Sequence, residues 1–385
     1  MPWREVPLRA LATCRRPWFY LRDPVRRVEL AAVGGGSPDG LAGGLPSWVG
    51  AMGYRNDVSP RERSGIAWPE VPAFVPTACW FRHRGDTIAG GPLPAAGPNL
   101  EQMHHRAPDF VPLEAQSAFE ARVGRAVAEI GAGHLEKVVL ARSAEVVAPS
   151  GYAFDPCAIL EILLARHAAS IVFAVGDGRR TFLGATPETL VSVVRGELET
   201  HAVAGTAPRA ADSDEDQALG RRLLESEKDR EEQAVVARAI AARLRPFVVG
   251  LEVGRVQLLR LPAVQHLVSP IRARLRPGVT AQALAQALHP TPAVGGYPSA
   301  EADAWLRAEE PLDRGLYAGP VGFTTPSGDG LFAVAIRSAV VSPERAVAFA
   351  GAGIVRGSEP AAEWHETELK LATIGSALRL VETAS

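Results

Sequence analysis

Short strand-like runs joined by tight turns are the feature that most restricts the fold of this chain. Between residues 171 and 203 four apolar runs follow one another, and the turns Gly176-Asp177-Gly178 and Gly196 join the first pair and the last pair. Strands joined by such short turns pair antiparallel, because a parallel pair needs a long crossover. Similar runs occur at 28–33, 78–81, 137–147, 253–259, 316–323, 331–341 and 347–350. We therefore expect mostly antiparallel sheets.

Long helical segments are interleaved with these strands. From residue 115 to 130, apolar residues recur at spacings of four, four and three, and Gly131 supplies a stop. Further helices are expected over 156–168, 214–244 and 360–381. Strands and single helices alternating in this way predict an α+β fold. The change of character near residue 115 separates a strand-rich N-terminal part, 1–114, from a core, 115–385, and we expect both to form one structural domain.

Composition narrows the classes of partner and of location. Lys plus Arg is 41 and Asp plus Glu is 43, a formal net charge of -2, which argues against a general nucleic-acid binder. No secretory signal and no apolar stretch of about 20 residues is found, so we expect a cytoplasmic protein with no membrane span. The three cysteines are far apart and odd in number, and indicate neither a disulfide framework nor a thiolate zinc site.

Carboxylates recur at i, i+4 and i+7 in two of the expected helices. They are Glu225, Asp229 and Glu232 in the first, and Glu359, Glu363 and Glu366 in the second, where Lys370 follows four residues later. Such spacing places each set on one helix face. Two facing stripes could hold a hard divalent cation such as Mg²⁺. Two solvated faces with i,i+4 ion pairs explain the spacing equally simply, and are commoner.

Three charged residues adjoin apolar runs. Lys137 heads such a run, where an amine can lose its proton near neutrality and act as a base, although most such lysines only extend the amine to water. Glu188 lies between two strands, either as a desolvated carboxyl acting as an acid or as a solubilising edge residue. Arg337 lies inside the expected strand 331–341, either in a structural ion pair or as a clamp for a ligand carboxylate.

Two further segments are shaped for a site. His289-Pro290-Thr291-Pro292 reads as a rigid loop whose histidine either orients a substrate or only caps the loop. Gly351-Ala352-Gly353 is expected as a turn between a strand and the last helix, where main-chain N–H groups could receive a carboxylate. An ordinary strand-to-helix turn explains these glycines as well.

Taken in order, eight segments resemble the chorismate-utilising enzymes, and among them the isochorismate synthases. The segments are Lys137-Val-Val-Leu-Ala-Arg142, Gly184-Ala-Thr-Pro-Glu-Thr-Leu190, Ala204-Gly-Thr206, Ser226-Glu-Lys-Asp-Arg-Glu-Glu232, Leu288-His-Pro-Thr-Pro-Ala-Val-Gly-Gly296, Gly315-Leu-Tyr-Ala-Gly-Pro-Val-Gly322, Ala335-Ile-Arg337, and Gly351-Ala-Gly-Ile354 through Glu363-x-x-Glu-x-x-x-Lys370. They cover about residues 115 to 380. The N-terminal third is similar more loosely, at 48–56.

The resemblance implies a fold of two large stacked antiparallel sheets with helices outside, and a reaction. Water adds at C2 of chorismate while the C4 hydroxyl departs, giving isochorismate. The resemblance also implies that Lys137 is the base and Glu188 the acid. It implies Mg²⁺ as cofactor, bound by Glu232 and Glu366 with Asp229 and Glu363 in support. The residues that it places in the substrate site are Gly205, Thr206, His289, Ala293, Tyr317, Arg337, Gly351, Gly353 and Lys370. It favours a monomer. Whether the product feeds menaquinone, a siderophore or salicylate stays open.

One departure and three alternatives accompany this resemblance. Gln233 follows Glu232, where the family often has histidine, which alters the surroundings of the expected metal ligand. Salicylate synthases, which go on to eliminate pyruvate, typically carry threonine where this chain has Ala293, so Ala293 favours stopping at isochorismate. Anthranilate and aminodeoxychorismate synthases carry a different loop here, and the retained Lys137 argues against them. A catalytically silent binding subunit is the remaining alternative.

Overall fold

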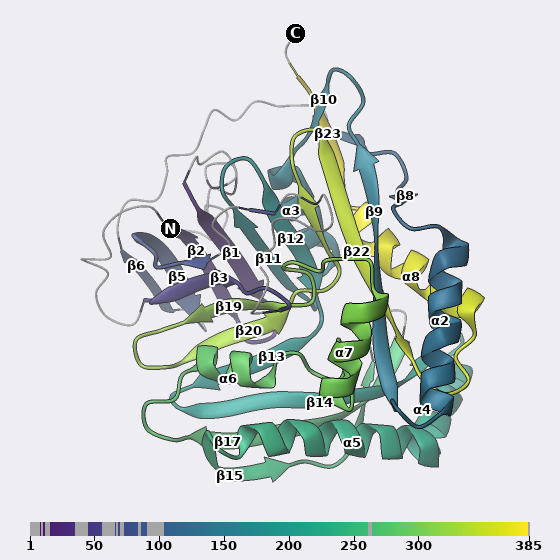
Figure 1. Ribbon diagram of the computed structural model, residues 1–385. Helices are drawn as coiled ribbons and strands as arrows, with labels where there is room; N and C mark the ends of the chain where they lie inside the picture. The colour runs from purple at the N-terminus through teal and green to yellow at the C-terminus, as the bar shows by residue number, and fades with distance from the viewer. Residues whose placement is uncertain are drawn as a thin grey trace.

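The computed structural model describes residues 8, 11, 16–34, 45–55, 66, 68–69, 73–83, 86–90, 104–260 and 264–383. Within these ranges the side chains of His104, Thr206, Lys228 and Glu232 are outside the description. Two large antiparallel sheets stack against each other, and helices cover their outer faces and edges (Figure 1). The expected α+β fold with two stacked antiparallel sheets is confirmed.

The first sheet has eleven strands. From one edge to the other they are β18 (Gly296–Tyr297), β9 (Lys137–Val147), β22 (Arg345–Ile354), β21 (Ser338–Val341), β12 (Thr181–Thr186), β11 (Ile171–Gly176), β1 (Trp18–Asp23), β2 (Val28–Val33), β5 (Ala78–His83) and β6 (Asp86–Gly90), and β8 (Val111–Pro112) also pairs with β9. Every pairing is antiparallel, as the short turns predict.

The second sheet has nine strands. In order they are β15 (Val248–Val253), β17 (Val264–Leu275), β14 (Glu197–Pro208), β13 (Thr189–Val194), β20 (Gly330–Val334), β19 (Pro320–Thr324), β3 (Trp48–Ala51) and β4 (Ala73–Phe74), and β16 (Gln257–Arg260) also pairs with β17. A small third sheet joins β10 (Tyr152–Phe154), β23 (Arg379–Glu382) and β7 (His104–Arg106). The N-terminal strands thus extend both large sheets of the core: β1 pairs with β11, and β3 pairs with β19.

The helices pack on these sheets from outside. They are α2 (Gln116–Gly131), α3 (Pro156–Arg166), α4 (Ser213–Glu225), α5 (Glu227–Leu244), α6 (Ala281–Leu288), α7 (Ser299–Glu309) and α8 (Pro360–Gly375). α8 packs on β22 and against α2, while α5 runs along β14 and β17, at the bottom of Figure 1. In the described part of the chain, none of the helices combines the length and the apolar character that crossing a bilayer requires.

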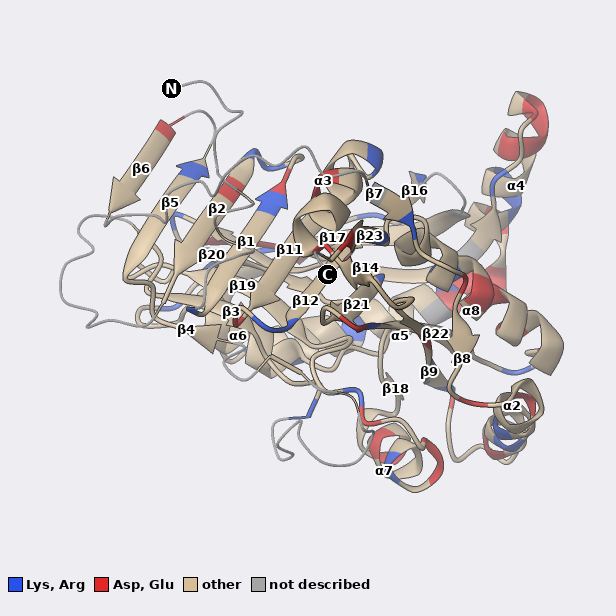
Figure 2. Ribbon diagram, turned by 90° about the horizontal axis from the view of Figure 1, so that it is seen from above, with Lys and Arg blue, Asp and Glu red and all other residues tan. Residues whose placement is uncertain are grey.

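Apolar side chains between the sheets form the main core. This core includes Phe173 and Phe182 from the first sheet and Phe323 and Phe332 from the second, all at most 3% exposed. A second core lies between the outer face of the first sheet and α3 and α8. Seen from above, the strands of the first sheet carry few charged residues along their length (Figure 2). Burial of both faces explains why several strands read as continuous apolar runs.

The helix expected over 214–244 is in fact two helices, α4 and α5. Ser226 stands between them in extended conformation, and its hydroxyl accepts a hydrogen bond from Asp229 N. A serine in this position caps the second helix and ends the first, because its side chain competes with the helical main-chain bonds. Glu225 therefore belongs to a different helix from Asp229, and the expected stripe of three carboxylates on one face is wrong.

The strand expected over 331–341 is also divided. β20 belongs to the second sheet and β21 to the first, so the chain passes between the sheets at residues 335–337. Arg337 has φ +54°, a left-handed conformation that a strand cannot contain. The expectation that Arg337 lies inside a strand is therefore wrong. Its side chain instead projects from a corner that the two sheets share.

Candidate active site

Lys137 is the first residue of β9, and two neighbouring strands frame it. Tyr297 of β18 pairs with it on one side, and Gly353 of β22 stands opposite Val139 on the other. A Cβ atom at Gly353 would lie 3.2 Å from Lys137 Cε and 3.7 Å from its Nζ. The glycine thus leaves the space that the lysine side chain occupies. The half-buried amine lies over the strand rather than extending away from the protein.

Glu188 stands where the chain leaves β12 of the first sheet and enters β13 of the second. Its main-chain N–H donates to Thr186 Oγ1 (3.2 Å), and its carbonyl accepts from Val334 N (3.0 Å). Burial raises the pKa of the Glu188 carboxyl, and Arg337, Lys137 and Lys370 act in the opposite direction. These three cations therefore lie close enough to the carboxyl to favour its charged form. A carboxyl whose pKa is raised retains its proton at higher pH, as a general acid requires.

Arg337 and Tyr317 form one wall of the same site. Burial lowers the pKa of the Arg337 guanidinium, and Tyr317, Glu366 and Glu188 oppose this shift. Tyr317 is 4% exposed, and burial raises the pKa of its hydroxyl to about 12. A Cβ atom at Gly351 would lie 3.1 Å from this hydroxyl. Gly351 thus makes room for Tyr317, as Gly353 does for Lys137.

The two glycines lie within β22, not in a turn before the last helix. Gly351 pairs with Ala141 and Gly353 with Val139, so the expected strand-to-helix turn at 351–353 is wrong. The strand extends further because every residue up to Ile354 finds a partner on β9. The carbonyl of Gly351 accepts a hydrogen bond from Lys370 Nζ at 2.6 Å. This bond attaches the amine of α8 to the strand that faces the site.

Helix α8 supplies the acidic side of the site. Lys370 Nζ also donates to Glu366 Oε1 (2.5 Å), the i,i+4 pair that the sequence indicates. Glu363 Oε2 is buried and has no hydrogen-bond partner among the described residues. Burial, followed by the charge of Glu366, raises the pKa of Glu363, while Ser358 and Lys370 oppose this shift. Glu359 is the residue before the helix, so the expected stripe begins at Glu363.

Asp229, in the first turn of α5, approaches the site beside Gly205. Gly205 has φ +71° and lies at an irregularity of β14, and a Cβ atom there would be 3.2 Å from Asp229 Cβ. Asp229 also accepts a hydrogen bond from the Ser226 hydroxyl. Gln233 is 1% exposed, and its Nε2 donates to Ala202 O (3.4 Å). The Thr206 and Glu232 side chains lie outside the described residues, so the structure does not test their expected roles.

Only one part of the loop that contains His289 lies at the site. His289 Nε2 lies 3.0 Å from Tyr54 O, and burial lowers the pKa of the ring to about 4, with Arg314 and Arg243 acting in the same direction. Lys137, Arg337 and Lys370, which act on Glu188, are not among the groups that shift the pKa of His289. Ala293 does reach the site, because it and Glu188 line one cavity of about 10 Å³, room for roughly one water molecule.

His266 on β17 is a site residue that the sequence analysis missed. Its Nδ1 lies 3.3 Å from Gly205 O, and burial lowers the pKa of its ring, with Lys370, Arg337 and Lys137 adding to the shift. These are the same three cations that act on Glu188. The signal in the sequence is a histidine among the largely apolar residues 264–268. Arg337 gives the same kind of signal, because it is a charged residue within an apolar run.

The site as a whole is a cluster of cations near one buried carboxyl. Lys137, Arg337 and Lys370 all act on Glu188, and Lys370 in turn interacts with Glu363 and Glu366. Such an arrangement suits a small substrate with more than one negative charge, and it provides an amine and an acid for proton transfer. Among the described side chains, no group of three His, Cys, Asp or Glu residues stands close enough to hold a metal.

Comparison with known proteins identifies relatives across most of the chain. The family described as "Chorismate binding enzyme" matches residues 98–379. A protein of Pseudomonas aeruginosa named "Salicylate biosynthesis isochorismate synthase" is 47% identical over 264 residues, covering 68% of this chain and 55% of that protein. "Isochorismate synthase EntC" of Escherichia coli K12 is 32% identical over 393 residues, covering 96% and 97%. The chain thus spans about half the length of the Pseudomonas relative and nearly all of the Escherichia one.

Two solved structures have the same fold. The menaquinone-specific isochorismate synthase MenF of Escherichia coli superposes with a TM-score of 0.82 at 24% identity, covering 98% of this chain and 92% of its own. A structure described as a putative 2,3-dihydroxybenzoate-specific isochorismate synthase, DhbC of Bacillus anthracis, superposes with a TM-score of 0.77 at 28% identity, covering 94% and 96%. The two-sheet architecture is therefore one that solved proteins of this kind share.

Proposed function

This chain belongs to the chorismate binding enzymes, and from that premise we propose that it is an isochorismate synthase. The observation that carries the proposal is that Glu188, a carboxyl whose pKa burial raises, lies near enough to the amine of Lys137 for the two groups to interact electrostatically. The reaction needs an acid for a poor leaving group and a base for a weak nucleophile. The names of the most similar relatives support the same activity.

In the proposed reaction, the Lys137 amine takes a proton from water as the water oxygen bonds to C2 of the ring. The ring double bonds shift, and the C4–O bond breaks while Glu188 gives its proton to the departing oxygen. One water enters and one leaves, so chorismate and isochorismate are isomers. Arg337 and Tyr317 would hold one substrate carboxylate, because a buried guanidinium and hydroxyl lack water as a competing partner.

We also propose Mg²⁺ as the cofactor, held by Glu232 and Glu366 with Asp229 and Glu363 in support. Among the described side chains, one oxygen is suited to a hard cation: Glu363 Oε2 is buried and has no hydrogen-bond partner among them. The pKa of Glu363 is raised by burial and by the charge of Glu366, and a nearby cation would favour its charged form. When bound, Mg²⁺ would offset the charge of a second substrate carboxylate. A cytoplasmic location and a monomeric state belong to this proposal, and the buried cysteines Cys79 and Cys157 suit a reducing compartment.

Product analysis by chromatography and mass spectrometry tests the function. Purified protein would be incubated with chorismate, with and without Mg²⁺. Isochorismate formed only with Mg²⁺, and without pyruvate, is the expected result. Salicylate with pyruvate would leave Lys137 and Glu188 in their roles and overturn the argument from Ala293. Failure to turn over chorismate, with chorismate still bound, would favour the silent binding subunit.

A further inference from the structure

Arg314 and Glu310 form an ion pair that is buried on both sides. Their side chains are 2% and 1% exposed, and the contact is bidentate, with Nε to Oε1 at 2.6 Å and Nη2 to Oε2 at 2.8 Å. A buried pair of this kind adds little net stability over apolar residues of similar size, because desolvation offsets the attraction. The other contacts of the pair are therefore informative.

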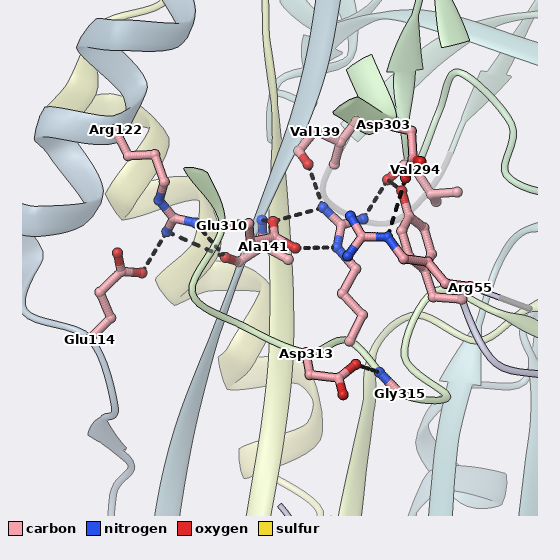
Figure 3. A network of polar contacts seen from close by, with 12 residues as sticks. Arg55, Glu114, Arg122, Val139, Ala141, Val294, Asp303, Glu310, Asp313 and Gly315 are labelled. Carbon is pink, nitrogen blue, oxygen red and sulfur yellow. Dashed lines mark hydrogen bonds and ion pairs between the residues drawn. The ribbon is translucent and has the colours of Figure 1, made fainter. Parts of the chain in front are cut away.

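The guanidinium of Arg314 joins two main-chain carbonyls from different segments. Nη2 donates to Val139 O at 2.6 Å, and Nη1 donates to Val294 O at 2.7 Å. Val139 lies two residues after Lys137 on β9, and Val294 directly follows Ala293. Figure 3 shows both carbonyls directed at the same network. One side chain thus spans the gap between the strand of the proposed base and the loop that lines the cavity beside Glu188.

The pair lies along the edge of β9 that faces away from β22, where strand partners are sparse among the described residues. β18 pairs with β9 at Lys137 and Val138 only, and β8 pairs with it at Ala144 and Glu145. Between them, Glu310 Oε2 accepts a hydrogen bond from Ala141 N at 2.8 Å, and Arg314 satisfies the carbonyl of Val139. Side chains therefore complete the edge that a neighbouring strand would otherwise complete.

The Tyr54 ring packs against the guanidinium, and main-chain hydrogen bonds hold the surrounding segments. The guanidinium carbon lies 4.3 Å from the centre of the Tyr54 ring, and the Tyr54 main-chain N–H donates to Gly315 O at 2.7 Å. The main-chain carbonyl of Arg314 accepts from Tyr317 N at 2.8 Å. The segment that carries Tyr317 is thereby joined to the other two.

We propose that Arg314 is a positioning residue for the isochorismate synthase reaction, and this inference rests on the proposed function. Its guanidinium, oriented by Glu310, sets the separation between the strand that carries Lys137 and the loop that carries Ala293. Water and leaving group react at different carbons of one ring, so both sides must hold their places relative to the substrate. A displacement of about 1 Å can lower a rate by roughly 100-fold.

The first test is Arg314→Lys, in which the charge is kept and the planar fork is lost. A single ammonium cannot make the same bidentate contact with Glu310 while reaching both carbonyls. We expect kcat to fall by about 10- to 100-fold and KM for chorismate to change by less than about threefold, because Arg337 and Tyr317 remain. Unchanged kcat would overturn the proposal.

Arg122→Lys is the matched control. Arg122 is also buried, at 1% exposure, and is paired with a carboxylate, Glu114. It reaches a single carbonyl, that of Ala141, at 3.4 Å, and within the described part of the chain it forms no hydrogen bond or ion pair with the loop. We expect this variant to lower the Tm while leaving kcat within about twofold of the wild-type value. An equal loss of kcat in both variants would show that Arg314 only stabilises the fold, and it would overturn the proposal.

The double variant Arg314→Met with Glu310→Leu separates positioning from stability. Replacing a buried pair by apolar residues commonly preserves or raises stability. We expect the Tm to return to near the wild-type value while kcat stays low, because Val139 O and Val294 O lose their shared donor. Recovery of kcat together with Tm would overturn the proposal. This variant also serves if Arg314→Lys does not fold.

Hydrogen exchange provides a readout that does not depend on turnover. The Val139 amide donates to Gly295 O at 2.9 Å, a bond that the loop must keep. We expect its exchange to accelerate at least about tenfold in Arg314→Lys and to be unchanged in Arg122→Lys. If the wild-type protein forms no isochorismate, the proposed function fails, and this measurement still decides whether Arg314 holds the loop against β9. Unchanged exchange of the Val139 amide in both variants would overturn the proposal that Arg314 holds the loop in place.

Discussion

Glu188 and Arg337 lie at adjoining crossings of the chain between its two large sheets, and hydrogen bonds tie each crossing to the strand that leads to the other. The carbonyl of Glu188 accepts from Val334 N at 3.0 Å, and that of Arg337 accepts from Ala185 N at 3.2 Å. The two crossings therefore hold a carboxyl and a guanidinium close together in a buried corner. Burial raises the pKa of the carboxyl, and Arg337 is the strongest opposing influence.

Glu188→Gln should remove the proton donor without changing the shape of the site. We expect kcat to fall by at least about 100-fold, the usual range for loss of a general acid, with little change in Tm. Initial rates of isochorismate formation measure this. Glu197→Gln, at a 61% exposed carboxylate on the second sheet, is the control and should keep full activity. Near-wild-type turnover of Glu188→Gln would refute the acid role.

Lys137 can be tested for base chemistry separately from charge. We expect both Lys137→Ala and Lys137→Arg to lose at least about 100-fold in kcat, because an arginine keeps the positive charge but cannot lose its proton to act as a base. Chorismate affinity should fall more in the alanine variant than in the arginine variant. Calorimetric binding beside rate measurements separates the two effects. Activity retained by Lys137→Arg would show that the position needs only a cation.

Gly353→Ala should disturb the base without unfolding the strand. The new Cβ would lie 3.2 Å from Lys137 Cε, so the flexible side chain must shift by a few tenths of an ångström. We expect kcat to fall by roughly tenfold with Tm changed by only a few degrees. Gly124→Ala in α2, where a new Cβ meets nothing within 4 Å, is the control and should be fully active. Equal rates in both variants would contradict the close approach.

Glu366→Gln tests the proposed cofactor site. Loss of one anionic ligand should raise the Mg²⁺ concentration for half-maximal activity by at least about tenfold. A titration of rate against Mg²⁺, with binding of the metal alone followed by calorimetry, measures this. Glu231→Gln, an exposed carboxylate next to Glu232 on α5, should leave the titration unchanged. If both variants behave alike, the metal is held elsewhere.

His289 should make stability depend on pH in a defined window. Burial lowers the pKa of the ring from 6.5 to about 4, so the folded protein favours the neutral ring. The resulting stability is fully present above pH 6.5 and is lost as the pH falls from 6.5 toward 4. Across this window we expect the Tm of wild type to fall more steeply than that of His289→Gln. His365→Gln, at an exposed histidine, should instead follow the wild type.

The sequence predicted most elements well where local signals agree. The strand at Lys137–Val147 and the helix beginning beside residue 115 match the structure, because the spacing of apolar residues and the residues that end each element indicate the same structure there. The prediction failed at Ser226, where a side-chain cap outweighs helical propensity, and at Arg337, where an apolar run passes from one sheet to the other. Local pattern cannot distinguish one buried strand from two strands in different sheets.

The candidate site was likewise predicted in part. The ordered motifs predicted that Lys137 and Glu188 belong to one site, and in the structure Lys137, Arg337 and Lys370 act on Glu188. Spacing alone misjudged Glu225, which ends α4 and does not share a helix with Asp229, and Glu359, which precedes α8. His266 was missed because it lies in a strand that no turn signal marks, and its proximity to Gly205 arises only when β14 and β17 pair.

The two crossings have a consequence for how the protein acquires activity during folding. Gly184 pairs with Ser338 across the first sheet, and Thr189 pairs with Ala333 across the second, so both contacts join segments distant in the chain. Closing such long loops is entropically costly and slow compared with forming helices or hairpins. We therefore expect the reacting groups to come together late in folding. Recovery of turnover after dilution from denaturant should lag behind recovery of helical circular dichroism.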